Sequence, residues 1–445
     1  MPHVKSTTTA SSASRVRLPL ALAAASVAVW CVALHWISPG PIADEREHWR
    51  IIVGLSQGRW PDPGHIATSP AYHFLVAQVV KVLGPHIVVA RACSALATIG
   101  ALWLIYAAAR IRHGDRAPGY VLLWALNPLF FPYSAQVYTE ATTLLVLAAA
   151  VWLHVRRKTL LAAVALLLAC LLRWNNVVWV AFFAAWRIAD DWDAARIAPA
   201  PLPPREGPGE GTGAGRCDPH PALPPRGGGF AGELWPYLAA LALVAGYLLY
   251  NVDWALRPGM HNPAGFNPAQ LYLLGFVLVV LWLPVWVRRV SGFWRQRVGP
   301  ALARGWVAAL LLAGMGPLVA WYVNPHPWNW NPNYLHDQFL TLLATSLAAR
   351  CVLVGLIVAV LPLAAGFFWQ RTDRAAVLAA WSFAVLFLAP HFLVDHRYHI
   401  FPVMFVHFCT RYTGRELRAL SWWSGLLTAA VAAYLALHAT PHSGL

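Results

Sequence analysis

Residues 18–49, LPLALAAASVAVWCVALHWISPGPIADEREHW, join an apolar run to an acidic segment, and this join decides the fold of the chain. The run from Leu18 to Ile37 contains no Asp, Glu, Lys or Arg. About 20 apolar residues suffice for a helix to cross the hydrocarbon core of a bilayer, because a helix satisfies its backbone polar groups internally. The pattern therefore predicts a membrane-spanning helix that places the acids of PIADEREHW, residues 41–49, at the membrane surface.

Apolar runs of this kind recur along the whole chain of 445 residues. The chain is 59% hydrophobic and 11% charged, with a mean hydropathy of +0.53, whereas soluble domains carry about 25% charged residues. Its 24 Trp residues also suit a membrane, because indole favours the interface between lipid and water. We expect an all-α polytopic membrane protein with about 11–13 transmembrane helices. After the first span, the apolar runs lie at about 86–109, 118–134, 137–154, 159–172, 174–187, 234–252, 270–287, 305–323, 350–369, 375–389, 400–413 and 420–438.

The net charge of +15 first suggests a nucleic-acid partner. The basic residues, however, form short clusters between apolar runs, as in Arg156-Arg157-Lys158, which is the distribution found in cytoplasmic loops of membrane proteins. We therefore expect no nucleic-acid binding. Residues 1–17 are polar, basic and free of acids, and the apolar run after them is too long for a secretory signal. This predicts a cytoplasmic N-terminus and a retained first span.

The loops divide the chain into four parts. We expect a cytoplasmic N-terminus over 1–17, an N-terminal transmembrane module over 18–187, a disordered cytoplasmic insertion over 188–233 and a C-terminal transmembrane module over 234–440. The insertion is predicted from residues 199–229, which are almost all Pro, Gly, Ala and charged residues and cannot bury a core.

The outer loops hold the groups of chemical interest. The first outer loop, residues 39–85, ends in the apolar stretch 70–84, which contains Lys81. This stretch is too short to span a bilayer, so it predicts a juxtamembrane helix. The outer loops of the C-terminal module are expected at 253–269, 324–349 and 390–399.

The acids of the first outer loop follow the period of a helix. Asp44, Glu47, His48 and Ile51 fall at positions i, i+3, i+4 and i+7, on one helical face. Acids at a helix N-terminus complement the helix dipole, and that interpretation stays open for Glu47 and His48. It does not explain three acids beside a bilayer, so we favour a functional role for Asp44 and Glu45.

Two later outer loops supply further binding groups. Residues 324–338, NPHPWNWNPNYLHDQ, are rich in aromatic residues and Asn, which suits either sugar stacking or a lipid interface. Residues 391–399, HFLVDHRYH, concentrate His396, Arg397 and His399 and favour the binding of a phosphate group. An Arg side chain that only reaches toward the headgroups is the alternative.

Metal and nucleotide motifs are missing from these loops. The expected outer loops contain neither a nucleotide-binding glycine loop nor an Asp-x-Asp pair, and the six Cys residues form no Cys-x-x-Cys pair. The sequence therefore shows no signature of a nucleotide-binding site in these loops. No cofactor and no metal ligand are expected; the sequence allows a divalent metal but does not imply one.

This series of motifs resembles the eukaryotic dolichyl-phosphate-glucose α-1,2-glucosyltransferase family, which adds the last glucose to the N-glycan precursor. The resemblance runs in order across almost the whole chain except the segment 188–233. The residues that match the family's motifs are Asp44-Glu45, Gly58, Trp60, Asp62-Pro63, Thr68-Ser69-Pro70, Arg91, Tyr138, Thr139, Glu140, Arg173, Asn176, Trp179, Arg397-Tyr398 and Pro402. The family's Asp-Asn-Arg-His-Tyr segment corresponds here only to NPNYLHDQ, residues 331–338.

The first loop is also similar to the broader class of integral-membrane (GT-C type) glycosyltransferases that use polyprenyl-phosphate sugars. That class includes protein mannosyltransferases and lipid A aminoarabinose transferases. The resemblance implies a GT-C-like bundle with an inverting glycosyltransferase activity. A hexose, glucose-like, would pass from a polyprenyl-phosphate sugar to a hydroxyl group of a glycan, lipid or protein acceptor. We expect an integral protein of the bacterial inner membrane, or of the endoplasmic reticulum membrane in a eukaryote, with its active site on the extracytoplasmic face.

The candidate residues take roles from this chemistry. Asp44 is the expected general base, because transfer of the proton of a sugar hydroxyl to a carboxylate is worth about 10²–10⁴-fold in rate. Glu45 would orient either the acceptor or the base. Arg397, helped by His396 and Arg173, would stabilise the departing lipid phosphate. The other expected substrate-binding residues are His48, His326, Asp395 and Tyr398.

Two other classes of protein stay open. A flippase or transporter of lipid-linked sugars would place ionisable groups near the middle of its spans and show internal repeats, and the sequence shows neither. A non-catalytic subunit of a glycosylation complex is compatible with the same motifs.

Overall fold

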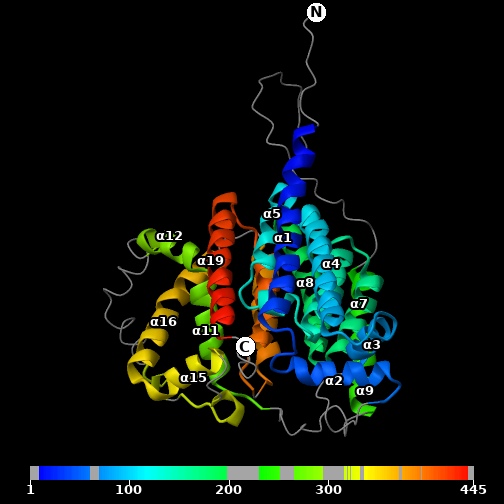
Figure 1. The fold of residues 1–445 in the computed structure, drawn as a ribbon. Coiled ribbons are helices and arrows are strands. Elements are labelled where there is room, and N and C mark those ends of the chain that lie inside the picture. Colours follow the sequence, from blue (N-terminus) through cyan, green and yellow to red (C-terminus); the bar gives the residue numbers. More distant parts are fainter. Residues whose placement is uncertain are drawn as a thin grey trace, which may run out of the picture.

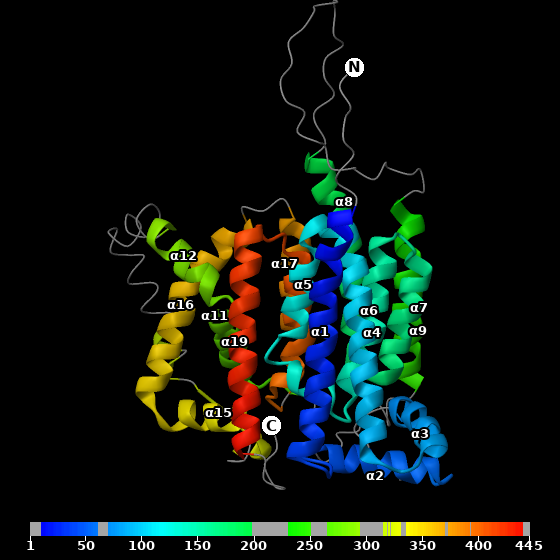
Figure 2. The same cartoon turned by 45° about the horizontal axis from the view of Figure 1, so that its top comes forward.

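The computed structural model describes residues 10–60, 70–197, 230–250, 265–293, 315–317, 319–320, 322–330, 335–369, 373–391 and 393–438. Within these ranges every regular element is a helix. Figures 1 and 2 show long helices side by side and shorter helices lying across one end of the bundle. The all-helical membrane fold is confirmed for this part of the chain.

The N-terminal half builds the larger group of helices. They are α1 (Ala10–Ile37), α2 (Glu45–Ser56), α3 (Ala71–Leu83), α4 (Ile87–His113), α5 (Ala117–Ala125), α6 (Thr139–Val155), α7 (Thr159–Leu172), α8 (Val177–Ile197) and α9 (Phe230–Tyr250), with the 3₁₀ turns η2 (Gly114–Arg116), η3 (Phe131–Ser134) and η4 (Trp174–Asn176). Many buried positions on α4, α6 and α7 are alanine, which lets these helices approach closely.

The C-terminal half contributes to both sides of the molecule. Its elements are α11 (Ala269–Leu281), α12 (Leu283–Phe293), η6 (Pro327–Trp330), α15 (Leu335–Thr345), α16 (Leu347–Trp369), α17 (Arg374–Leu388), η7 (His396–His399), α18 (Ile400–Cys409) and α19 (Gly414–His438). α17 and α18 pack into the N-terminal group, where the ring of Trp179 lies 4.9 Å from Phe387 and 4.7 Å from Phe405. The helices α11, α12 and α16 gather on the opposite side (Figure 1).

Five described helices are long and apolar enough to cross a membrane. They are Pro19–Ile37, Ile87–Ala125 (α4, η2 and α5 taken as one segment), Gly232–Tyr250, Leu347–Trp369 and Gly414–Leu437, and the bent pair Ala269–Leu281 with Leu283–Val290 makes a sixth. We expected about 11–13 spans. Part of the difference is that α6, α7 and α17 are apolar but shorter than 18 residues. The expected span at 305–323 falls largely outside the described residues.

Two expected spans are interrupted at proline. The helix expected over 118–134 ends at Ala125, before Pro128 and Pro132, because proline has no amide hydrogen to donate within a helix. The chain continues through the 3₁₀ helix η3 to Tyr138, and this stretch without α-helix supplies part of the candidate site. The span expected over 270–287 is divided into α11 and α12, which meet at an angle of 69°.

The segment expected to be disordered, 188–233, begins and ends as helix. α8 extends to Ile197, and α9 begins at Phe230. The remaining part of that segment, including the Pro- and Gly-rich residues 199–229, lies outside the described residues.

The juxtamembrane helix expected at 70–84 is present as α3. It packs on α2, and both helices lie across one end of the bundle (Figure 2). Ile51 and Ile52 of α2 share a buried cluster with Tyr72 and Val76 of α3. α3 ends at Gly84, whose φ of 95° is a conformation that residues with a Cβ atom rarely adopt. This hairpin-like pair fixes the start of α2, where the acidic segment lies.

Candidate active site

Asp44 and Arg397 form the centre of the candidate site. Asp44 directly precedes α2 as its N-cap residue, and Arg397 lies in η7, in the other half of the chain. Nη1 of Arg397 donates a hydrogen bond of 3.1 Å to Oδ2 of Asp44. The contact therefore joins the first outer loop to the segment 391–399 at the end of the bundle where α2 and α3 lie.

A second carboxylate, Asp395, holds the Arg397 guanidinium from the other side. Nε and Nη2 of Arg397 lie 2.6 and 2.5 Å from Oδ2 of Asp395, and the backbone amide of Arg397 donates to Oδ1 at 2.8 Å. Burial opposes ionisation of the Asp395 carboxyl, but the guanidinium of Arg397 holds its pKa below the ordinary value. Asp395 is thus a fixed anion that sets the position of the guanidinium.

The two carboxylates differ in their access to a substrate. The side chain of Asp44 is 45% exposed, whereas that of Asp395 is 5% exposed. The Arg397 side chain is 18% exposed. Asp44 is therefore the carboxylate of this group that is accessible from outside the protein.

Glu45, the neighbour of Asp44, is fully buried and points elsewhere. Its carboxylate accepts hydrogen bonds from Nη2 of Arg91 at 2.7 Å, from the amide of Val137 at 2.8 Å and from the amide of Ile42 at 3.0 Å. Arg91 itself is fully buried and also donates to the carbonyl of Gly40. Glu45 therefore ties together the turn before α2, helix α4 and the stretch before α6.

Two tyrosines from the stretch between α5 and α6 line the site. The ring of Tyr138 lies 5.4 Å from the guanidinium carbon of Arg397 and 5.2 Å from the ring of His48. Tyr133 shares a hydrogen bond of 2.8 Å between its hydroxyl and Nε2 of His396. Burial raises the pKa of both phenols well above the ordinary value, so both remain neutral hydrogen-bonding groups.

A second guanidinium lies beside this group. Nη1 of Arg173 donates a hydrogen bond of 2.6 Å to Oε1 of the buried Glu140. The guanidinium carbon of Arg173 also lies 5.8 Å from the ring of Tyr398, whose centroid is 4.1 Å from that of the tilted His391 ring. Arg173 is thus connected to the η7 segment through Tyr398.

The histidines of the site are neutral, which corrects one expectation. Burial, opposed by Asp395 and reinforced by Arg397 and the neighbouring imidazoles, lowers the pKa of His396 to about 3, and burial likewise lowers the pKa of His399 to about 4. We expected both to add positive potential. Because a desolvated imidazolium is unfavourable, the cationic groups of the described site are instead Arg397 and Arg173.

His48 and His326 take different places. Nδ1 of His48 lies 2.7 Å from Nε2 of His73 on α3, and the His48 ring contacts Tyr138, so His48 belongs to the site. His326 is buried in the segment before η6, where its carbonyl accepts from the amide of Asn329. We assign His326 to the segment that contains Asn329 rather than to the Asp44–Arg397 pair.

Sequence reasoning missed Tyr133 and the structural role of Arg91. Tyr133 lies in FFPYSAQVYTE, residues 130–140, where the aromatic density between two apolar runs was an available signal. Arg91 was matched to a family motif, but its partner Glu45 lies 46 positions away. No local pattern indicates a contact at that separation.

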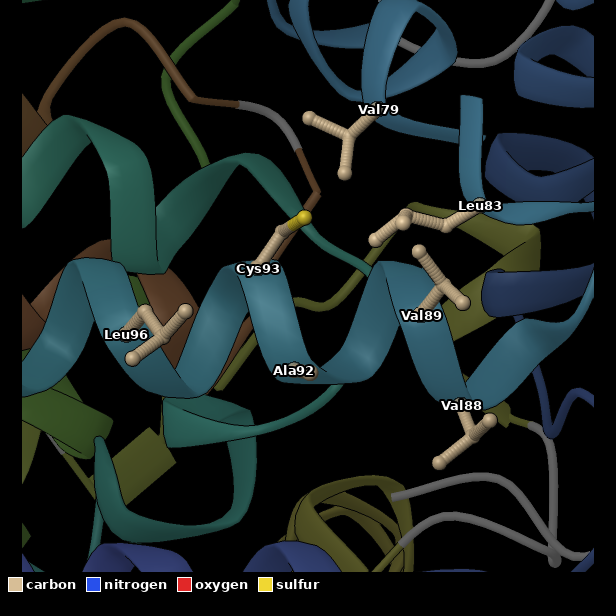
Figure 3. A pocket seen from close by; sticks show the side chains of 7 residues that line it. All are labelled: Val79, Leu83, Val88, Val89, Ala92, Cys93 and Leu96. Carbon is tan, nitrogen blue, oxygen red and sulfur yellow. The ribbon is translucent and has the colours of Figure 1, made fainter. Parts of the chain in front are cut away.

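An apolar groove lies between α3 and α4, on elements adjoining the site. Figure 3 shows it lined by Val79 and Leu83 of α3 and by Val88, Val89, Ala92, Cys93 and Leu96 of α4. Its volume is about 260 Å³, and its lining carries no charged group. The groove suits contact with lipid chains and offers no group for acid–base chemistry.

The arrangement can perform proton transfer next to an anion-binding group. An exposed carboxylate, Asp44, lies beside a guanidinium that a buried anion holds in place, and neutral aromatic side chains surround both. Such a site can take a proton from a hydroxyl group and bind a phosphate or phosphate-like leaving group.

Comparison with known proteins agrees with this chemistry. The model of the DIE2/ALG10 family, the family of dolichyl-phosphate-glucose α-1,2-glucosyltransferases, matches residues 39–202 of the chain. The resemblance stated from the sequence is confirmed over these residues, which include Asp44, Glu45 and Arg173. The family's members are membrane glucosyltransferases. No curated protein and no solved structure matches the chain.

Proposed function

We propose that the chain transfers glucose from a polyprenyl-phosphate sugar to a hydroxyl group of a glycan acceptor, with inversion at the anomeric carbon. The observation that carries this proposal is the exposed Asp44 carboxylate, which lies within the family-matched region and is paired with Arg397 at the end of the helix bundle. Because the donor's polyprenyl chain stays in the bilayer, the enzyme has to work at the membrane surface.

Asp44 acts as the general base. Its carboxylate accepts the proton of the acceptor hydroxyl as that oxygen attacks the anomeric carbon of the donor. The bond between the anomeric carbon and the phosphate oxygen breaks, the new glycosidic bond forms on the opposite face of the sugar, and polyprenyl phosphate leaves. A carboxylate that is 45% exposed can meet the acceptor, whereas the buried Asp395 cannot.

Arg397 binds the phosphate of the donor and stabilises it as the leaving group. Asp395 holds Nε and Nη2 of the guanidinium, so Nη1 is the nitrogen that turns toward Asp44. A donor phosphate that takes over the Nη1 contact would free the Asp44 carboxylate for its role as base. Arg173, held by Glu140 and next to Tyr398, supplies a second positive charge for the same group.

Glu45 positions the base and does not contact the acceptor. Of the two roles open from the sequence, orienting the acceptor or orienting the base, burial of its carboxylate favours the second. By fixing the amide of Ile42 and the side chain of Arg91, Glu45 holds the turn that presents Asp44. A displacement of about 1 Å in such a group can cost about 10²-fold in rate.

The site faces the extracytoplasmic side in this proposal. The basic turns at 110–116 and 156–158 lie at the ends of α4 and α6. Asp44 and α2 lie at the opposite end of the bundle (Figure 2). The positive-inside rule supports an extracytoplasmic Asp44, in a bacterial inner membrane or its eukaryotic counterpart.

The test is an assay of the purified full-length protein with a panel of polyprenyl-phosphate hexoses carrying glucose, mannose or galactose. Glycan, lipid and peptide hydroxyl acceptors are supplied in parallel, and released polyprenyl phosphate is measured. The proposal predicts release that depends on a glycan acceptor and is fastest with the glucose donor. Movement of a labelled donor across liposomes without release of polyprenyl phosphate would instead indicate a flippase.

A further inference from the structure

Three metal-binding side chains converge beside the Asp44–Arg397 pair. His336 comes from the start of α15, and Asp395 and His396 come from the start of η7. Each offers one ligand atom, and these three atoms lie within 4.8 Å of one another. Ligands around one Zn²⁺ ion at about 2.0–2.2 Å lie about 3–4 Å apart, so small side-chain rotations would bring the three atoms onto a common ion.

His396 is already oriented as a ligand. Its Nε2 atom shares a hydrogen bond with the hydroxyl of Tyr133 at 2.8 Å, which fixes the ring. Its Nδ1 atom is buried and has no hydrogen-bond partner among the described residues, although Oδ1 of Asp395 lies 3.4 Å away. Buried polar atoms in folded proteins nearly always have a partner. A hydrogen bond on one ring nitrogen with the other left for an ion is the usual arrangement of a metal-bound histidine.

Asp395 is likewise prepared for an ion. Its Oδ2 atom is held by the guanidinium of Arg397, and Oδ1 accepts the backbone amide of Arg397. These bonds keep the carboxylate ionised and fixed in direction, as outer groups do for ligating carboxylates. A second buried carboxylate, Asp337, lies beside the ring of His336, with Oδ1 at 3.2 Å from Nε2. Asp337 therefore sets a carboxylate against one ring nitrogen of His336, the kind of contact that orients a ligating imidazole.

We propose that His336, Asp395 and His396 bind one divalent transition-metal cation of the Zn²⁺ type. Two imidazole nitrogens and one carboxylate oxygen suit such ions, whereas Mg²⁺ and Ca²⁺ prefer oxygen ligands alone. Three protein ligands leave a coordination position open.

The place of the site gives the cation a role that rests on the proposed function. Arg397 bonds both Asp395, a ligand, and Asp44, the base. A phosphate oxygen of the donor at the open coordination position would lie next to the guanidinium. The cation and Arg397 would then stabilise the charge of the leaving phosphate together.

The test measures metal binding apart from transfer. Full-length protein, purified with an affinity tag that lacks histidine and stripped with a chelator, is titrated with Co²⁺ while visible d–d absorption is recorded. The compared proteins are the wild type, His336→Gln, His396→Gln and the control His86→Gln, whose side chain is exposed in the turn between α3 and α4. Size-exclusion profiles and thermal unfolding identify any variant that has not folded.

The proposal predicts one Co²⁺ per chain with d–d absorption in the wild type and in His86→Gln. Loss of either ligand should weaken the binding by about 10–100-fold or more. Binding that is absent in the folded wild type, or unchanged in both His336→Gln and His396→Gln, overturns the site. If one variant fails to fold, the other decides. Stoichiometric Co²⁺ binding in a protein that shows no sugar transfer would support the site and count only against the proposed function.

Discussion

The carboxylate of Asp44 lies 3.1 Å from the guanidinium of Arg397, although the two residues are 353 positions apart. This contact joins the family-matched first loop to a segment near the other end of the chain. It sets an exposed base beside a fixed cation.

Arg397 is expected to serve donor binding and turnover together. Arg397→Ala should weaken both, because it removes charge from the phosphate site. Arg397→Lys should have a donor affinity and a turnover between those of Arg397→Ala and the wild type, because a lysine ammonium cannot reproduce the forked contacts with Asp395 and Asp44. The measurement is the apparent donor affinity and turnover of both variants on one lipid-linked donor, with Arg110→Ala as the control. A donor affinity unchanged in Arg397→Ala would remove Arg397 from the phosphate site.

Glu45 and Glu47 provide a matched pair of acids with opposite expectations. The Glu45–Arg91 ion pair is fully buried, so Glu45→Gln should lower the free energy of unfolding by about 3–5 kcal/mol. The Glu47–Arg50 pair is exposed, with side chains 47% and 63% accessible, so Glu47→Gln should change the free energy of unfolding by about 1 kcal/mol or less. Denaturant unfolding of both variants in detergent checks the difference. Equal stability of the two variants would contradict the structural role of Glu45.

A comparison of Glu45→Gln with Arg91→Lys tests whether Glu45 positions Asp44 or takes part in the reaction itself. Arg91→Lys retains a positive charge but cannot make every hydrogen bond that Arg91 gives to Glu45 and Gly40. If Glu45 acts by holding the turn before α2, Arg91→Lys should reduce turnover in the same direction as Glu45→Gln. A full loss of turnover in Glu45→Gln with normal stability and a normal Arg91→Lys would instead assign Glu45 to the reaction itself.

His48 makes a testable contribution to the pH dependence of stability. Burial, followed by the charges of Arg397 and Arg173, lowers its pKa to about 3, while the nearby Glu47 acts in the opposite direction. The unfolded chain binds the proton near pH 6.5 and the folded chain only near pH 3, so stability is lost as the pH falls below 6.5.

At about 1.4 kcal/mol per pH unit, the loss from His48 reaches up to about 2 kcal/mol at pH 5. The rings of His73, Tyr72 and Tyr138 enclose His48. His48→Gln should therefore flatten the fall of the thermal unfolding midpoint between pH 7 and pH 5. An unaltered pH profile in His48→Gln would show that this imidazole is not desolvated.

The two ends of α4 test which side of the membrane the site faces. His86 precedes α4 and Asp115 follows it, and both side chains are exposed. In a background without native cysteines, a membrane-impermeant thiol reagent applied to intact cells should modify His86→Cys and spare Asp115→Cys. Labelling of Asp115→Cys with protection of His86→Cys would reverse the orientation and place Asp44 in the cytoplasm.

Much of the fold follows from local apolar length. The first span, the juxtamembrane helix α3 and the bounds of α6 and α7 lie where the sequence predicts them, because each is a separate apolar run between polar or basic residues. The interrupted helices were not foreseen, since Pro128 and Pro284 lie inside runs whose hydropathy alone suits a span. Hydropathy predicts which segments lie in lipid, but it does not predict where a proline interrupts the hydrogen bonds of the helix backbone.

The candidate site was predictable only in part. Asp44 and Arg397 could be chosen from the sequence because each is a charged group beside an apolar run. That Glu45 turns into the core depends on Arg91, and the neutral state of His396 depends on desolvation, neither of which a residue's neighbours in sequence determine. The pairing of Asp44 with Arg397 is a product of the tertiary structure.

The most direct test of the account is the turnover of Asp44→Asn on a polyprenyl-phosphate glucose donor. Asparagine keeps the size of the side chain but cannot accept the acceptor's proton, so the lost interaction belongs to the transition state. Turnover should fall by about 10²-fold or more while donor affinity changes little, and the control Asp115→Asn, at the exposed turn beyond α4, should match the wild type. Near-normal turnover of Asp44→Asn at equal expression would show that Asp44 is not the base and would contradict the mechanism proposed for this site.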